Sequence, residues 1–317
     1  MTSLALLLLG LVGLWRGTLW AVRGAVELSE QYGLSHGFVG LAVLAIGTDL
    51  PELVVAVSAS VEQMKGVEAS GMIVGSALGS VVAQSTLVLG VAGLLGYLPV
   101  APRMIRRDGT ILLIAVAIAA AVALDGRITR TEGLILLLVY TVYFAALWQA
   151  ERGGTAVEAE AESDVLKAAP FSAPLSIAVG LGVILVSAHL VVRGGVELAG
   201  LLGVSQTLVA VILVGLGTSL PELALSIRAA TERHAALSVG NVIGSNTFDL
   251  LVPVGVGATM HPLMVERSTV LFDVPAVALV SIVLLGFLVR RRGLQRWEAL
   301  VLLGLYATYA GTRIALG

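Results

Sequence analysis

The stretch GTDLPEL at residues 47–53 occurs a second time in this chain, as GTSLPEL at residues 217–223. The two copies lie 170 residues apart, and the stretch VRGAVEL at residues 22–28 returns as VRGGVEL at residues 192–198 with the same spacing. Because one spacing relates two separate motifs, the sequence indicates that the chain is built from two structural repeats.

The composition around these motifs is that of a protein in lipid. Of 317 residues, 57% are hydrophobic and 13% are charged, whereas soluble domains carry about 25% charged residues. A helix that crosses the hydrocarbon core needs about 20 mostly apolar residues. Long apolar runs such as residues 112–124 favour helices over a barrel. The sequence therefore predicts an all-α integral membrane protein.

Charged and Pro/Gly-rich clusters divide the chain into ten predicted transmembrane helices. The predicted spans are residues 3–27, 37–61, 69–97, 109–125, 132–150, 173–198, 206–229, 236–258, 270–290 and 297–315. With both termini outside, eleven Lys and Arg residues fall on the cytoplasmic side and four on the outer side. The positive-inside rule therefore predicts an N-out, C-out protein of the cell membrane.

Five spans in each half mean that the second repeat enters the membrane from the opposite side. We therefore predict a first inverted repeat at residues 1–150, an acidic cytoplasmic linker at 151–172 and a second inverted repeat at 173–317. The acidic residues of the linker lack the glycine turn and the ligand spacing of a calcium loop. A solvated linker is favoured over a regulatory cation site.

Proline interrupts the second and the seventh span within the repeated motif. Pro51 and Pro221 have no amide hydrogen to donate, so we predict broken helices with freed backbone carbonyls at both positions. A glutamate follows each proline, Glu52 in the first copy and Glu222 in the second. An ionisable side chain at mid-membrane depth is by default a functional-site hypothesis.

A third match, between residues 75–84 and 240–249 at an offset of 165, predicts the helices that face these motifs. Each segment has two glycines four positions apart, which is typical of a face where helices approach closely. One turn of helix separates the polar residues that follow. These polar residues are Ser80, Gln84, Ser245 and Asp249.

The acidic residues of these segments have no basic neighbour in the sequence. No Lys or Arg occurs in residues 24–64, 194–227 or 234–266. Unpaired buried carboxylates must be protonated or bind metal, and oxygen ligands without Cys or His suit Na⁺, Ca²⁺ or Mg²⁺. The candidate ligands are Glu52, Glu222, Asp249, Thr48, Thr218, Ser80, Ser245 and Gln84.

Three ionised carboxylates can be balanced by three Na⁺ or by one Ca²⁺ and a proton, so mutually exclusive occupancy gives a physical basis for exchange. We predict a transporter and no enzyme, because the sequence has no Gly-x-Gly-Asp element and no Ser/His constellation of an intramembrane protease. A passive cation channel is an alternative, although inverted repeats around broken helices do not favour a continuous pathway. The net charge of −2 does not suggest a nucleic-acid partner.

At these motifs the chain resembles the cation/calcium exchanger superfamily, specifically its prokaryotic sodium/calcium exchanger-like branch. That family carries two alpha repeats that read roughly G-T-S-L-P-E and G-N-x-I-G-S-N-x-x-[ND], and residues 217–222 and 240–249 match them closely. The resemblance covers nearly the whole chain. It implies ten helices, alternating access by sliding of the first helix of each repeat, and Ca²⁺ and Na⁺ as transported ions rather than cofactors.

The resemblance also implies a set of ion ligands. They are Glu52, Glu222, Asp249, Thr48, Thr218, Ser80, Ser245 and Gln84, with the backbone carbonyls of Ala45 and Gly215. The first repeat departs from the family pattern, because Asp49 replaces the usual Ser and Gln84 stands where Asn is expected. Asp49 has three open roles: a fourth ligand carboxylate, a proton carrier, or a residue that faces a polar cavity.

The residue types of the motif also indicate which ion is exchanged for Ca²⁺. Proton-coupled exchangers of the same superfamily usually carry an Asn-containing motif in place of the Thr-Ser-Leu-Pro portion, so the resemblance favours sodium coupling. A proton-coupled exchanger of Ca²⁺ or another divalent cation is the main alternative. The sequence sets no oligomeric state, and a monomer is compatible with it.

Overall fold

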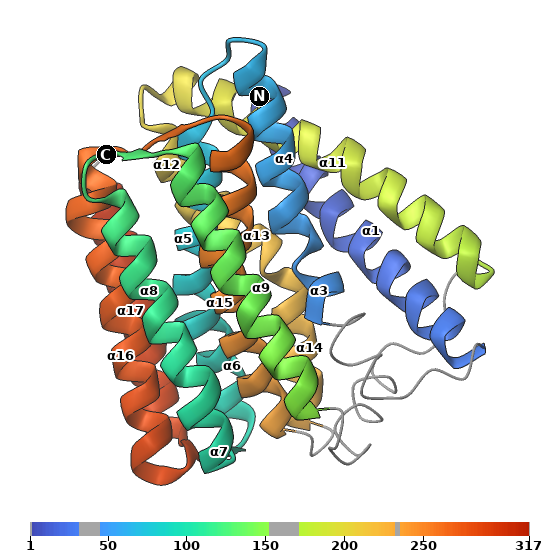
Figure 1. The fold of residues 1–317 in the computed structure, drawn as a ribbon, viewed down its shortest axis with the longest axis vertical. Helices are drawn as coiled ribbons and strands as arrows, with labels where there is room; N and C mark the ends of the chain where they lie inside the picture. Colours follow the sequence, from blue (N-terminus) through green and yellow to red (C-terminus); the bar gives the residue numbers. More distant parts are fainter. Residues whose placement is uncertain (1, 32–44, 152–170, 232–234, 317) are drawn as a thin grey trace.

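The computed structural model describes residues 2–31, 45–151, 171–231 and 235–316, and nearly all of them are helical (Figure 1). The described helices are α1 (Thr2–Gln31), α3 (Ala45–Thr48), α4 (Leu50–Met64), α5 (Ser70–Val82), α6 (Leu89–Leu95), α7 (Pro102–Met104), α8 (Thr110–Ala123), α9 (Arg130–Glu151), α11 (Ala173–Leu202), α12 (Gln206–Val209), α13 (Gly215–Thr218), α14 (Leu220–Thr231), α15 (Ala235–Met260), α16 (Val274–Arg291) and α17 (Arg296–Leu316). They are joined in part by π-helical turns η2 (Ala83–Val88), η3 (Ile105–Gly109), η4 (Ala210–Val214) and η5 (Thr269–Asp273). Most of the predicted acidic linker, residues 151–172, lies outside the described residues.

Six of the described segments are long and apolar enough to cross a membrane. These segments are Thr2–Leu28, Ser70–Leu95, Arg130–Gln149, Ala173–Leu202, Thr269–Arg291 and Arg296–Leu316. A seventh candidate consists of two helical halves, Gln206–Thr218 and Leu220–Thr231, whose axes differ by 42°. By length and composition, the chain is a multi-pass, all-helical membrane protein.

The helical segment that contains the predicted fourth span extends beyond its predicted start at residue 109. The helical segment begins at Pro102 and continues through the charged turn η3 into α8. The charges do not end the helix, because Arg107 donates to buried Asp108 through two hydrogen bonds of 2.8 and 3.1 Å. The other two arginines of this segment, Arg103 and Arg106, are exposed, so their charged groups do not have to be buried for the helix to continue.

Helices α1 and α11 lie side by side along most of their length at one edge of the molecule (Figure 1). Glycines line their contact. A Cβ added at Gly17 would lie 2.8 Å from the carbonyl oxygen of Gly180, and one added at Gly180 would lie 2.5 Å from the amide nitrogen of Ala21. The two backbones therefore approach as closely as small residues allow.

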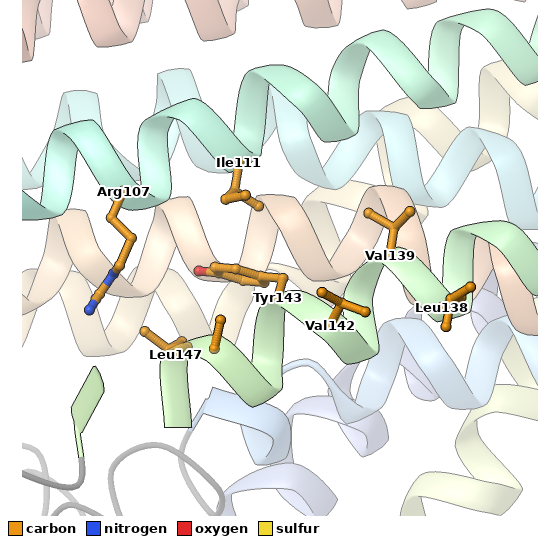
Figure 2. Close-up of a pocket in the computed structure, with 8 residues that line it drawn as sticks. Arg107, Ile111, Leu138, Val139, Val142, Tyr143 and Leu147 are labelled. Atoms are coloured by element: carbon orange, nitrogen blue, oxygen red, sulfur yellow. The ribbon is translucent and has the colours of Figure 1, made fainter. Parts of the chain in front are cut away.

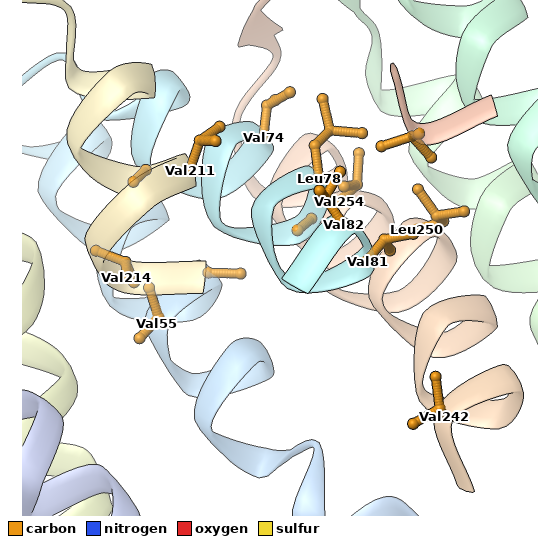
Figure 3. Packing of buried hydrophobic residues seen from close by; sticks show 14 of the residues in the cluster. Val55, Val74, Leu78, Val81, Val82, Val211, Val214, Val242, Leu250 and Val254 are labelled. Atoms are coloured by element: carbon orange, nitrogen blue, oxygen red, sulfur yellow. The ribbon is translucent and has the colours of Figure 1, made fainter. Parts of the chain in front are cut away.

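The centre of the bundle is built around α5. Buried side chains from α4, η4 and α15 pack against it (Figure 3). The labelled residues of this core are Val55, Val74, Leu78, Val81, Val82, Val211, Val214, Val242, Leu250 and Val254. Because α5 is enclosed by elements of both halves, polar residues on α5 are brought against motifs that lie far away in the sequence.

Two short antiparallel pairings join loops from the two halves. Strand β1 (Leu98–Pro99) pairs with β4 (Gly293–Leu294), and β2 (Arg127–Ile128) pairs with β3 (Leu263–Met264). In each pairing, a loop of the first half supplies one strand and a loop of the second half supplies the other. The first ladder joins the chain after α6 to the chain after α16, and the second joins the chain before α9 to the chain after α15.

We expect Gly180→Val to lower the thermal unfolding temperature of the detergent-solubilised protein, because the new side chain would force α1 and α11 apart. Overpacking of this kind costs about 1–3 kcal/mol. Gly182→Val is the matched control on the same helix, since no described atom lies within 4 Å of a Cβ added there. Differential scanning fluorimetry checks both variants, and equal losses would contradict the close contact at Gly180.

Candidate cation site

Both copies of the repeated motif lie where a helix is interrupted. Helix α3 ends at Thr48 and α4 begins at Leu50, while α13 ends at Thr218 and α14 begins at Leu220. The residues at the breaks are Asp49 and Ser219. Each break ends one short helix and begins another inside a region that is otherwise packed with helices.

The structure modifies the predicted role of the prolines. Pro51 and Pro221 are the second residues of α4 and α14, where an amide hydrogen would have no helical partner in any case. The prolines therefore start new helices instead of kinking continuous ones. The freed backbone groups are those of the residues before each break.

The two glutamates occupy the first turn of the helices that follow the breaks. Glu52 lies in the first turn of α4, and Glu222 lies in the first turn of α14. Unpaired amide groups at a helix N-terminus favour negative charge. Each glutamate carboxylate therefore lies where the partial positive charge of a helix N-terminus compensates part of its negative charge.

Ser80 on α5 connects the two motif copies. Its hydroxyl Oγ lies 3.4 Å from Glu52 Oε1, 3.2 Å from the carbonyl oxygen of Gly215 and 3.2 Å from Thr218 Oγ1. Thr218 also donates to the Gly215 carbonyl, at 3.3 Å. The Ser80 hydroxyl thus lies close to the carboxylate of Glu52, which also belongs to the first half. It lies equally close to a carbonyl and a hydroxyl of the second half.

Gln84 forms a second connection, from the π-helical turn η2. Its Nε2 donates to Asp249 Oδ2 at 3.0 Å and to Ser219 Oγ at 3.4 Å. Ser219 in turn donates to the carbonyl oxygen of Gly215 at 2.8 Å. The extra residue of a π-helical turn rotates the following side chains, and such turns frequently occur at functional sites.

The site is enclosed by protein, yet many of its oxygen atoms have no hydrogen-bond donor. Its polar residues are buried, with at most 6% of any one exposed. Among the described residues, the atoms without a hydrogen-bond partner include Thr48 Oγ1, Asp49 Oδ1, Glu52 Oε2, Gln84 Oε1, both Oε atoms of Glu222 and Asp249 Oδ1. Buried acceptors without donors are costly, and a hard cation is the partner that satisfies several of them together.

Four carboxylates share this region. Glu222 interacts electrostatically with Glu52 and Asp49, and Asp249 interacts with all three. In the described part of the chain, no Lys, Arg or His forms an ion pair with any of these four residues. Uncompensated charges of one sign at this depth of burial are strongly unfavourable.

The remaining predicted ligands lie at the same place. Asp49 lies beside Ser245 and Glu222, and Thr48 also lies beside Glu222. Ala45 is the first residue of α3, and the predicted role of its carbonyl stays a prediction. Within the described residues, no three acidic or histidine side chains converge as a metal centre by themselves, so a cation here requires hydroxyl, amide or carbonyl oxygens as additional ligands.

Close backbone approach brings α5 to the second motif. A Cβ added at Gly75 would lie 2.8 Å from Ala210 Cβ, and one added at Gly215 would lie 2.6 Å from the amide nitrogen of Ser80. The predicted glycine face of α5 is thereby confirmed. The corresponding glycines of the second half are Gly240 and Gly244. The first-half segment that would face them, equivalent to η4, lies outside the described residues, so this second glycine face stays a prediction.

The sequence analysis did not select three polar residues that contribute to the site region. Ser219 joins Gln84 to the Gly215 carbonyl, as described above. Asn246 donates to Ser85 at 2.7 Å between α15 and η2, and its own Oδ1 has no partner among the described residues. Ser219 could have been found from the repeat itself, because it occupies the position of Asp49 in the second copy.

Comparison with known proteins gives consistent matches over almost the whole chain. Residues 2–149 and 172–315 match the family model described as sodium/calcium exchanger protein. The sodium/calcium exchanger MaX1 of Methanosarcina acetivorans is 28% identical, with 96% of each chain covered. An uncharacterized membrane protein of Methanocaldococcus jannaschii, MJ0091, is 31% identical, with 94% of each chain covered. A solved structure of the sodium-calcium exchanger NCX_Mj soaked with Na⁺ and Sr²⁺ has 28% identity and a TM-score of 0.65, with 98% of each chain covered.

We expect Glu222→Gln to raise the thermal unfolding temperature of the ion-free protein by at least about 2 °C. The reason is that the change removes one of four mutually repelling buried charges, and the new amide can donate to a neighbouring carboxylate. Added Ca²⁺ should stabilise the wild type more than the variant, because ligand binding to the folded state adds to its stability.

Glu62→Gln is the control for this comparison. Glu62 lies near the surface, 2.8 Å from Lys65 and 3.7 Å from His189 on α11, and each such pair contributes about 0–1 kcal/mol. Both unfolding temperatures are measured with a chelator and with Ca²⁺. A lower unfolding temperature for ion-free Glu222→Gln than for ion-free wild type would show that the carboxylate is compensated by the protein itself.

Proposed function

This chain belongs to the sodium/calcium exchanger family, and from that membership and the geometry of its buried carboxylates we propose that it exchanges Ca²⁺ for Na⁺ across the cell membrane. The family is one of exchangers, which are transporters rather than enzymes. The observation that supports the proposal most directly is the group of four buried carboxylates without a basic partner among the described residues. Such a group needs mobile cations for neutrality.

We propose that the cations are held between the two helix breaks by oxygen atoms from both halves. The carboxylate ligands are Glu52, Glu222 and Asp249, with Asp49 as a fourth. The hydroxyl, amide and backbone ligands are Thr48, Thr218, Ser80, Ser245, Gln84, Ala45 and Gly215. Oxygen ligands of mixed charge suit both Na⁺ and Ca²⁺, since Ca²⁺ accepts six to eight oxygen atoms in flexible geometry.

Exchange, rather than passive release, follows from the charge of the empty site. If the empty site switched from facing one side of the membrane to facing the other, its carboxylates would be enclosed by protein without a cation beside them. Removing each such charge from water costs several kcal/mol. Occupation by Na⁺ or by Ca²⁺ removes this cost. The protein therefore changes access mainly when loaded, and transport of one cation requires the return of the other.

We further propose two inverted repeats, residues 1–150 and 173–317, with ten transmembrane helices and both termini outside. In this architecture, α1 and α11 are the first helices of the two repeats, and they pack on each other as a pair. Fewer contacts join this pair to the short helices at the breaks, α3 and α13, and to α4. A sliding motion of the α1–α11 pair past the rest of the bundle would expose the site alternately to the two sides.

The test is uptake of radiolabelled Ca²⁺ into sealed vesicles, with Na⁺ and H⁺ gradients imposed separately. We expect uptake with an outward Na⁺ gradient and none when internal Na⁺ is replaced by an impermeant cation while a pH gradient is kept. Uptake driven by the pH gradient alone would indicate proton coupling. Uptake without any counter-ion gradient would indicate a channel and contradict exchange.

The same assay tests the site. Glu52→Gln should reduce uptake more than about tenfold, because losing a buried charged contact typically costs about 2–5 kcal/mol and 1.4 kcal/mol is a factor of ten. Glu62→Gln on the same helix should retain uptake, since that side chain lies near the surface beside Lys65. Undiminished uptake by Glu52→Gln would remove Glu52 from the site.

Asp49 distinguishes the two motif copies, and we propose that it adds a fourth carboxylate to the ligand set. It is 2% exposed, and its Oδ1 has no hydrogen-bond partner among the described residues. Its counterpart Ser219 is satisfied by Gln84 and the Gly215 carbonyl. The asymmetry gives the Asp49 side of the site one more negative charge.

We expect Asp49→Ser, which makes the two heptapeptides identical, to raise the Ca²⁺ concentration for half-maximal uptake by about tenfold, equivalent to about 1.4 kcal/mol of binding free energy. Asp125→Ser is the control, because Asp125 is an exposed loop residue that accepts a hydrogen bond from the Arg127 amide. Uptake is measured as a function of Ca²⁺ concentration for both variants. An unchanged half-maximal concentration for Asp49→Ser would show that this carboxylate only faces a polar cavity.

A further inference from the structure

A groove separates η3 and α8 from α9, away from the cation site. Its volume is about 420 Å³, within the range of pockets that hold small-molecule ligands. Side chains from the two walls face each other across it, with Arg107 at one end and Leu138 at the other (Figure 2). The lining residues are Arg107, Ile111, Leu138, Val139, Val142, Tyr143, Ala146 and Leu147.

The groove is apolar along its length and basic at one end. Six of its eight lining residues are aliphatic. Arg107 is fixed at the basic end by its two hydrogen bonds to Asp108, and its side chain is 31% exposed. Tyr143 also donates to Asp108, at 3.4 Å, and holds its ring against the groove wall.

The second half of the molecule contains the corresponding elements in a closed form. Helices α9 and α17 match at an offset of 166 residues, so that Tyr309 corresponds to Tyr143, and it donates to Asp273 at 2.8 Å. The residue before Asp273 is Phe272, which stacks on Tyr309 with ring centroids 5.6 Å apart and an interplanar angle of 3°. Phe272 covers the ring of Tyr309, whereas the ring of Tyr143 is part of the lining of the groove.

The positive charge is also placed differently in the two halves. In the second half it comes from Arg313 on α17, which is fully buried with Nε 3.1 Å from Asp273 Oδ1. The α9 residue at the position of Arg313 is Leu147, a wall of the groove. The first half therefore has an apolar wall where the second half has a buried cation, and its own cation lies at the open end of the groove.

Two further arginines precede Arg107 in the same helical segment. Arg103 and Arg106 are exposed, and the described residues provide no ion pair for either of them. The groove opens toward the bilayer, since only 17% of the most apolar window of α9 is buried in the protein. An apolar channel beside basic residues at the end of membrane-spanning helices complements a lipid with a negatively charged headgroup.

We propose that this groove binds a phospholipid with an anionic headgroup, with an acyl chain along Ile111, Val142 and Ala146 and the headgroup at Arg103, Arg106 and Arg107. The acyl chain buries apolar surface that the protein leaves uncovered. The headgroup interacts with arginines, whose planar guanidinium groups match phosphate geometry. The site is independent of the proposed exchange function, because none of its residues is a candidate cation ligand.

The experiment is native mass spectrometry of the full-length protein released from nanodiscs that contain equal amounts of phosphatidylglycerol and phosphatidylcholine with identical acyl chains. We expect the wild type to retain phosphatidylglycerol in preference to phosphatidylcholine. Ala146→Phe should reduce the retained phosphatidylglycerol about tenfold, because the ring fills the space of the acyl chain. Ala145→Phe is the matched control, since Ala145 is an equally exposed neighbour that does not line the groove.

A second pair of variants tests the headgroup. Replacing Arg103 and Arg106 with Gln should reduce the preference for phosphatidylglycerol by about fivefold per arginine. Arg290→Gln with Arg291→Gln removes two exposed charges from the same end of the bundle and should leave the preference unchanged. Equal effects of the two double variants would overturn headgroup recognition by the groove.

Equal retention by Ala145→Phe and Ala146→Phe, or equal retention of the two lipids by the wild type, would likewise overturn the proposal. Unfolding temperatures are measured for every variant. If Ala146→Phe does not fold, Ile111→Phe fills the groove from the opposite wall and carries the same expectation. Transport is not the readout, so a failure here is distinguishable from a failure of the exchange proposal.

Discussion

Buried negative charge without a basic partner is the constraint on which the rest of this structure depends. In the described residues, the acidic side chains at the two helix breaks have unpartnered oxygen atoms and no ion pair. A soluble protein would hydrate such groups or pair them with Lys or Arg. Here the compensation offered by the protein is partial, consisting of helix N-termini, hydroxyls and one amide, and this is the basis of the proposal that mobile cations complete the site.

The helix breaks position the buried carboxylates in a site with defined walls. At each break, the second residue of the following helix is a proline, which has no amide hydrogen to donate to the preceding turn. At the second break, the carbonyl of Gly215 accepts a hydrogen bond from the Ser219 amide and further hydrogen bonds from the Ser80, Thr218 and Ser219 hydroxyls. The proposed ion ligands and the helix ends are thus supplied by the same few residues.

The two halves are similar in architecture and different in chemistry. At the site, the pair Gln84 and Ser219 is neutral, whereas the corresponding pair, Asp249 and Asp49, is acidic. Away from the site, the residue before the buried aspartate is an arginine in one half and a stacked phenylalanine in the other. Repetition of a backbone arrangement therefore left each half free to acquire its own charges, because side chains at matching positions face different neighbours.

The sequence alone determined the membrane class, and it predicted the repeats and most of the polar residues of the proposed site. It could do so because apolar span length, an isolated carboxylate and a repeated Pro-Glu pair each have a physical meaning that does not depend on distant contacts. The start of the helical segment at Pro102 could not be read in this way, since helical structure continues through the charged residues of η3, where Arg107 pairs with Asp108.

Tertiary structure decided which groups meet. That Ser80 lies against Thr218, that Gln84 lies between Ser219 and Asp249, and that Tyr143 lines a groove while Phe272 stacks on Tyr309 all result from contacts between residues far apart in the chain. No local pattern contains this information, because a periodicity specifies which face of a helix a residue occupies but not which helix packs against that face.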